Sequence, residues 1–166
     1  RVLIVNSTSK AYGLPGLRLG WLVGPIDIIT DCWRRHEYAS ITTSMLSMEL
    51  ADKALSEPTR SKLKARAKKL IRTGFDVLTQ ELGRHPGVFD VVPPQASAMS
   101  FVRFNLPISS EDFCMRLLRE REVLVIPGSR FGVEGHFRFS SALPEDHLRQ
   151  GLARLNDLTG EILQGH

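Results

Sequence analysis

Two serines, a lysine and an arginine lie close together in the segment NSTSKAYGLPGLRLGW, residues 6–21. A lysine amine in water has a pKa of about 10.4, so a reactive lysine needs burial or nearby positive charge to lower that pKa. We expect both for Lys10, from the apolar stretches on either side and from Arg18. A phosphate needs several donors, which the Ser7 and Ser9 hydroxyls and the forked Arg18 guanidinium can supply. The segment predicts a reactive amine beside a bound phosphate, and the alternative is a solvated surface loop.

Two short apolar stretches flank this segment and predict the strands that position it. VLIV and LGWLVG are rich in β-forming residues and are bounded by polar residues or glycine. Gly13, Gly16 and Gly20 allow the intervening loop to turn tightly and to pass close to a ligand. We therefore expect Lys10 on a loop between two strands.

The fixed positions of the segment form the pattern SxSKxxGxxGxRxGW. This pattern closely resembles the lysine motif of the fold-type I, class I/II aminotransferases, which depend on pyridoxal 5'-phosphate (PLP). A match at so many positions is far more specific than a lone glycine pair. The resemblance implies that Lys10 is the catalytic lysine that bonds to the cofactor aldehyde, and that Ser7, Ser9 and Arg18 bind the cofactor phosphate. It also implies amino-acid and keto-acid substrates and a homodimer.

A second motif, VLVIPGSRFGVEGHFRFSSALPEDHLRQGLARL, resembles the C-terminal pattern of the same family. The resemblance implies that Arg138 binds the α-carboxylate of the substrate. A guanidinium suits this role because it can donate two parallel hydrogen bonds to a carboxylate. Strand alternation would place Phe137 and Phe139 on one face and Arg138 on the other. The alternative for Arg138 is an exposed strand residue in a salt bridge.

One segment departs from the family pattern. In PPQASAMSF, Ala96, Ser97 and Ala98 stand where many members carry glycines in a stretch that often faces the substrate. The reaction therefore stays open between amino transfer and another PLP chemistry, such as that of a lyase, cyclase, decarboxylase or oxidase. Two further alternatives are a PLP-sensing, aminotransferase-like domain of a transcription regulator and a non-catalytic fragment.

The remaining patterns predict an α/β chain in two parts. Helices are expected at 25–38, 43–55, 58–82 and 110–122 and from 144 onward, and strands at 88–92, 98–104, 123–126 and 136–139. In the final helix one apolar stripe is expected to face the core, formed by Leu148, Leu152, Leu155, Leu158 and Ile162. By the resemblance, residues 1–55 are the C-terminal part of the large PLP-binding domain, and residues 56–166 are the small C-terminal α+β domain. We expect a C-terminal fragment, inactive alone, because the chain begins without Met and the family's remaining cofactor contacts would precede it.

Composition narrows the class further. With 42% hydrophobic residues, the 166-residue chain can bury one sizeable core, and no apolar run has membrane-spanning length, so we expect a cytoplasmic protein without a membrane partner. The net charge is +4, but the basic run at 60–72 carries no interleaved aromatics, which favours a solvated helix face over a nucleic-acid surface. Cys32 and Cys114 lack metal-ligand spacing, as do four histidines, and no metal is expected. These histidines are His36, His85, His136 and His147.

Overall fold

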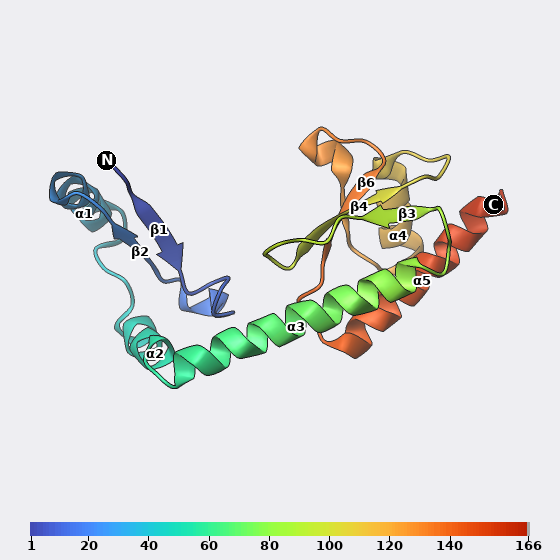
Figure 1. Cartoon of the computed structure of the whole chain (residues 1–166). Helices are drawn as coiled ribbons and strands as arrows, with labels where there is room; N and C mark the ends of the chain where they lie inside the picture. The colour runs from blue at the N-terminus through green and yellow to red at the C-terminus, as the bar shows by residue number, and fades with distance from the viewer. Residues whose placement is uncertain (166) are drawn as a thin grey trace. The chain divides into compact units, whose positions relative to one another are not determined.

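The computed structural model describes residues 1–165 of the chain, which divides into two compact units, Arg1–Lys68 and Lys69–His166 (Figure 1). We call them unit 1 and unit 2. Helix α3, Thr59–Leu82, begins in unit 1 and continues into unit 2. Helices and antiparallel strands occur in both units, so the predicted α/β class is confirmed.

Unit 1 contains a two-stranded ribbon and two complete helices. Strand β1, Ile4–Ser7, pairs antiparallel with β2, Gly20–Val23, and the short 3-10 helix η1, Pro15–Leu17, lies in the loop between them. Helix α1, Ile26–Ser40, follows Pro25, whose fixed φ suits the start of a helix. Helix α2 covers Met45–Leu55. The flanking strands predicted around the lysine loop are therefore present.

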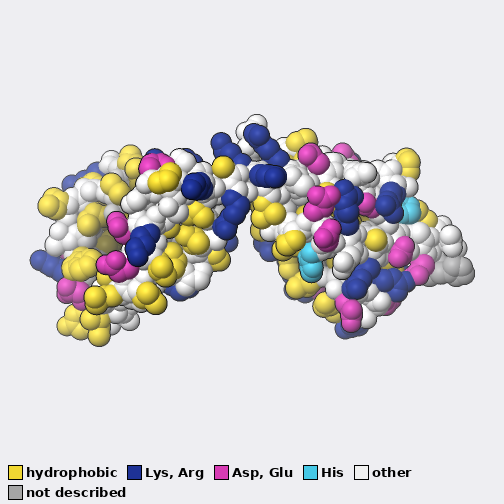
Figure 2. All heavy atoms as spheres, turned by 90° about the horizontal axis from the view of Figure 1, so that it is seen from below, with side chains coloured by type: hydrophobic (Ala, Val, Ile, Leu, Met, Phe, Trp, Pro, Cys, Tyr) yellow, Lys and Arg dark blue, Asp and Glu magenta, His cyan; other side chains and the backbone are white. Residues whose placement is uncertain are grey.

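Most apolar side chains of unit 1 lie at its surface. Within its described residues only Thr8, Ala51 and Ala54 are buried. Figure 2 shows many hydrophobic side chains on the visible face of this unit. The exposed large hydrophobic residues are Val2, Leu3, Ile4, Val5, Leu22, Val23, Ile26, Trp33, Tyr38, Ile41, Met45, Leu46, Met48 and Leu50. Unit 1 thus has almost no core of its own.

Unit 2 is built on a four-stranded antiparallel sheet with the order β3-β4-β6-β5. The strands are β3, Phe89–Val91; β4, Met99–Phe104; β5, Ile126–Pro127; and β6, His136–Ser140. Helix α4, Ser110–Arg121, stands between β4 and β5, and helix α5, Glu145–Leu163, follows β6. The 3-10 helix η2, Gly128–Phe131, comes directly after β5.

The strand predicted at 123–126 is wrong over most of its length, because β5 begins only at Ile126. Glu122 adopts a left-handed conformation with φ of 55°, and the Val123 amide donates to the Leu117 carbonyl. Residues 123–125 therefore leave helix α4 in a capping turn. The buried Val125 explains the apolar pattern that suggested a strand.

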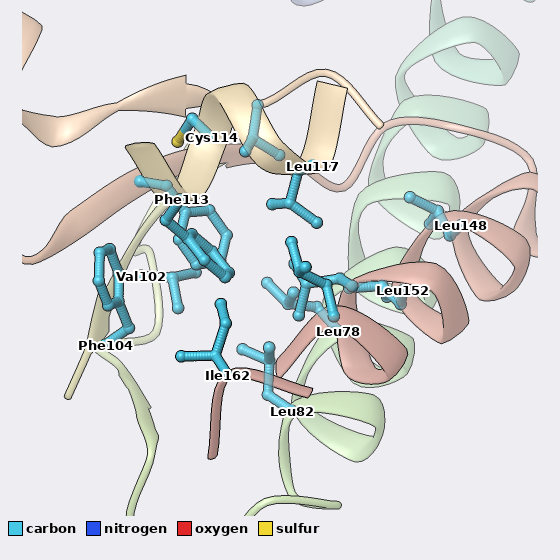
Figure 3. Close-up of a cluster of buried hydrophobic side chains, with 14 of the residues drawn as sticks. Leu78, Leu82, Val102, Phe104, Phe113, Cys114, Leu117, Leu148, Leu152 and Ile162 are labelled. Atoms are coloured by element: carbon cyan, nitrogen blue, oxygen red, sulfur yellow. The ribbon is translucent and has the colours of Figure 1, made fainter. Parts of the chain in front are cut away.

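The core of unit 2 lies between helices and one face of the sheet (Figure 3). The predicted stripe of α5 is confirmed, since all five of its apolar residues are buried. Leu78 and Leu82 of α3 and Phe113 of α4 pack into the same cluster, and the sheet contributes Val102 and Phe137. The opposite face of the sheet stays accessible, and this face carries Arg138.

Helix α3 passes very close to the segment that follows β6. A Cβ atom on Gly74 would lie 1.9 Å from the Ser141 carbonyl oxygen. Ser141 is itself fixed, because its amide and its hydroxyl both donate to the Ala98 carbonyl, at 2.8 and 3.0 Å. Glycine at position 74 is therefore a packing requirement of this crossing.

Candidate functional site

The lysine loop occupies residues 8–19, between the paired ends of β1 and β2. The register places Ser7 opposite Gly20, so the first and last residues around the loop are neighbours. A Cβ atom on Gly20 would lie 2.9 Å from the Asn6 carbonyl oxygen. The glycine therefore allows the two strands to meet closely at the base of the loop.

Thr8 anchors this loop from the inside and is fully buried. Its amide donates to the Leu19 carbonyl at 3.1 Å, and its carbonyl accepts from the Leu14 amide at 3.1 Å. The Thr8 hydroxyl lies 3.3 Å from the Leu14 carbonyl and 3.2 Å from the Leu19 carbonyl, so its single proton can be donated to either. These contacts join the two arms of the loop. The sequence analysis did not single out Thr8, because only the folded loop brings the two carbonyls to its hydroxyl.

Ser7, Ser9 and Lys10 lie on the first arm of the loop. The Ser9 amide donates to the Ser7 hydroxyl oxygen at 3.3 Å. The Lys10 side chain is exposed, so residues 1–165 do not provide the burial that was expected around it. Gly13 closes a tight turn, since its amide donates to the Lys10 carbonyl at 3.2 Å and its φ is +66°. A side chain at position 13 would be strained in this conformation.

Arg18 lies on the second arm, directly after η1. Its backbone is left-handed, with φ of 49°, and its guanidinium Nη1 donates to the Pro15 carbonyl at 3.0 Å. The side chain is exposed, and it forms no ion pair with any residue of the described chain. Most of the guanidinium donors therefore stay available for an anion.

The donors of the loop fit a phosphate group chemically. In the described part of the chain, neither the Ser9 hydroxyl nor the Lys10 amine has a protein partner. Together with the Arg18 guanidinium they offer neutral and positively charged donors from both arms of a loop that Thr8 holds closed. The loop thus carries an anchored set of donors, and no carboxylate among residues 1–165 pairs with Lys10 or Arg18.

Arg138 stands in the middle of β6 on the accessible face of the sheet. Phe137 is buried in the core and Arg138 is exposed, which confirms the predicted alternation for this pair. In the sheet Arg138 lies opposite Phe101 of β4 on one side and Ile126 of β5 on the other. Its Cζ atom lies 5.5 Å from the centre of the Phe131 ring. Arg138 is an exposed strand residue, as the alternative interpretation has it, but no carboxylate among residues 1–165 pairs with it.

The segment PPQASAMSF contains a residue with positive φ, Ser97. Ser97 adopts a φ of 78°, a left-handed value that glycine reaches without strain. Its hydroxyl oxygen accepts from the Met99 amide at 3.2 Å, which stabilises the turn into β4. Ser97 therefore holds a backbone conformation that favours glycine.

Similarity to known proteins decides the family. A sequence profile described as "Aminotransferase class I and II" matches residues 1–155. This chain belongs to the class I and II aminotransferases. It is 31% identical to capreomycidine synthase of Streptomyces vinaceus, over 99% of this chain and 42% of that protein. It is 27% identical to an aspartate aminotransferase of Streptomyces avermitilis, over 97% of this chain and 41% of that protein.

Solved structures of the family share the fold. A PLP-dependent aminotransferase from Streptococcus suis superposes with a TM-score of 0.86 at 30% identity, over 96% of this chain and 42% of that one. An aromatic aminotransferase from Pyrococcus horikoshii gives 0.83 at 27% identity, over 96% and 43%. The chain therefore spans about two fifths of the length of these relatives. The resemblance read from the sequence motifs is confirmed.

Other reactive groups lie outside this site. Burial raises the pKa of the Cys114 thiol to about 12, and the nearby carboxylates of Glu111 and Glu134 add to that effect. Cys32 and Cys114 are both free thiols. Across residues 1–165, no group of His, Cys, Asp or Glu is arranged to hold a metal ion, and no helix combines the length and apolarity needed to cross a membrane.

Proposed function

We propose that the complete protein is a PLP-dependent aminotransferase that transfers an amino group between an amino acid and a 2-keto acid. The observation that carries this proposal is the donor set of the lysine loop, anchored by Thr8, in a chain of the aminotransferase family. The Streptococcus suis relative is described as PLP-dependent, which supports the cofactor. The aspartate aminotransferase of Streptomyces avermitilis supports the reaction class.

In this proposal the residues of the lysine motif bind the cofactor and transfer the substrate proton. Ser7, Ser9 and Arg18 bind the cofactor phosphate through hydroxyl and guanidinium donors. When bound, PLP supplies an electron-accepting ring that stabilises negative charge at the substrate α-carbon. Lys10 would hold the cofactor covalently, and its amine would take the proton from the substrate α-carbon as a general base and return it as a general acid.

Arg138 completes the recognition of the substrate. Its guanidinium is exposed and has no carboxylate partner within the described chain, so it can donate hydrogen bonds to the α-carboxylate of an amino acid or keto acid. Two parallel N–H donors fix the orientation of a carboxylate as well as its position. Holding the substrate in this way lowers the entropy that must be lost at the reaction step.

We further propose the organisation of the complete protein. Residues 1–55 belong to its large PLP-binding domain and residues 56–166 form its small domain. The relatives are more than twice as long as this chain, which supports the proposal that the chain alone is inactive. The protein acts as a homodimer in the cytoplasm.

A second candidate is a different reaction on the same cofactor. The similarity to capreomycidine synthase, a protein not named as an aminotransferase, favours it. The replacement of glycines by Ala96, Ser97 and Ala98 points the same way, because it changes a segment that we expect near the substrate. The lysine loop determines the cofactor and leaves open which bond of the substrate breaks.

One experiment tests both candidates. The complete protein is titrated with PLP, reduced with borohydride, and mapped by peptide mass spectrometry, with Lys10→Arg as the charge-preserving control. We expect the reduced label on Lys10 alone, and release of a keto acid when amino acids are added one at a time. A Lys10 label with no transfer of the amino group to an added 2-keto acid would support the second candidate or a sensing role. Absence of the label from wild-type Lys10 would contradict the assignment of the cofactor site.

A further inference from the structure

Apolar residues from three different elements lie next to the exposed Arg138. Phe101 and Ile126 lie beside it on the neighbouring strands, and the Phe131 ring lies under its guanidinium with a separation of 5.5 Å. This separation is within the range of a cation–π interaction. The charge of Arg138 is therefore held by a ring face, since no carboxylate of the described residues pairs with it.

The position of the Phe131 ring is itself fixed by the backbone. Phe131 is the last residue of η2, which is closed by Gly132. Gly132 has φ of 73°, and its amide donates a hydrogen bond to the Ser129 carbonyl at 3.0 Å. A Cβ atom on Gly128 would lie 2.3 Å from the Val133 carbonyl oxygen, so the start of the turn also requires glycine. The turn PGSRFG thus has little freedom to move its phenylalanine.

Aromatic neighbours hold the ring from the other side. Phe101 meets Phe131 edge to face, with ring centres 5.9 Å apart, and stacks on His136 at 4.9 Å with an interplanar angle of 14°. The His136 Nδ1 atom lies 2.9 Å from the Glu134 carbonyl, which fixes that ring in turn. Despite these contacts Phe131 is 50% exposed. Burial in the core is therefore not the reason for a large aromatic side chain at this position.

We propose that Phe131 is a positioning residue that holds the Arg138 guanidinium ready for a substrate carboxylate. The proposal rests on the proposed role of Arg138. A ring beneath the guanidinium covers one face of its plane and leaves the N–H donors at its edge free, and these are the donors that a carboxylate uses for two parallel bonds. Without the ring, the long arginine side chain would lose more conformational freedom on binding the substrate.

The test compares Phe131→Leu with Phe131→Tyr in the complete, PLP-loaded protein. The substrate is the amino acid that reacts fastest in the screen described above, and the matched probe is the amine obtained by removing its carboxylate. For Phe131→Leu we expect KM for the amino acid to rise about three- to tenfold, with kcat nearly unchanged, because the lost interaction concerns binding. Phe131→Tyr keeps the ring and should stay close to the wild type. The affinity of the protein for the amine should be the same in the wild type, in Phe131→Leu and in Phe131→Tyr.

A double-mutant cycle with Arg138→Gln, which removes the cation, shows whether Phe131 acts through the arginine. If it does, adding Phe131→Leu to Arg138→Gln has little further effect on KM. A Phe131→Leu variant with wild-type KM and a normal Lys10 label would overturn the inference and leave the proposed function intact. A loss of affinity that is equal for the amine and the amino acid would overturn it as well. Failure of the wild type to label Lys10 would instead count against the proposed function.

Discussion

Substitution of Gly74 by alanine is expected to destabilise unit 2 strongly. The added Cβ would lie 1.9 Å from the Ser141 oxygen and 3.0 Å from Leu148 Cδ1, whereas ordinary contacts begin near 3.4 Å. Helix α3 and the segment after β6 must then separate by about 1.5 Å. Such a gap weakens the dispersion contacts of every side chain along the crossing. We expect a loss of about 2–4 kcal/mol in the free energy of unfolding, after subtracting the better helix propensity of alanine.

Gly151 in α5 provides the matched control. A Cβ atom there would meet no other atom within 4 Å, so Gly151→Ala should gain about 0.5–1 kcal/mol from helix propensity alone. Urea unfolding of the chain followed by far-UV circular dichroism measures both changes. Both tryptophans, Trp21 and Trp33, lie in unit 1, so tryptophan fluorescence would not report on this core. If Gly74→Ala were as stable as Gly151→Ala, the close approach of α3 to Ser141 would be refuted.

Two further substitutions test the loop and the buried thiol. Thr8→Val keeps the shape but removes the hydroxyl, so it should destabilise the loop by about 1 kcal/mol and raise the PLP concentration needed to label Lys10, whereas Thr8→Ser should do so less. Equal labelling of the two variants would contradict the anchoring role. Because burial raises the pKa of Cys114 from 9.0 to about 12, its thiol stabilises the fold below pH 9.0 and this contribution is lost as pH rises toward 12. The free energy of unfolding should therefore fall less steeply above pH 9.0 in Cys114→Ala than in the wild type. If it fell equally steeply with pH in both, titration of the Cys114 thiol would not contribute to the pH dependence.

The sequence predicted the elements that depend on local patterns. The apolar spacing along α5 is long and regular, so Leu148 through Ile162 could be assigned to the core before the structure was known. Alternation in β6 separated the buried Phe137 from the exposed Arg138 in the same way. The motif around Lys10 identified the family because many residue types recur at fixed spacing. The roles of Ser7, Ser9, Lys10, Arg18 and Arg138 stay predictions.

Features that depend on distant contacts could not be predicted in this way. The close approach of Gly74 and Ser141 joins residues far apart in the chain, and a single helical glycine gives no sign of its partner. The anchoring role of Thr8 follows from carbonyls that only the folded loop brings together. The strand predicted before Ile126 failed because a short apolar run also occurs in an irregular segment after a helix, here one that buries only Val125.

The uneven burial of apolar side chains has a consequence for how the protein is made. Synthesis proceeds from the N-terminus, so the ribbon and helices of unit 1 leave the ribosome before the core of unit 2 exists. Their exposed apolar side chains can associate non-specifically until other polypeptide covers them, since unit 1 buries only three residues of its own. Unit 1 produced apart from the polypeptide that covers these side chains is therefore expected to self-associate.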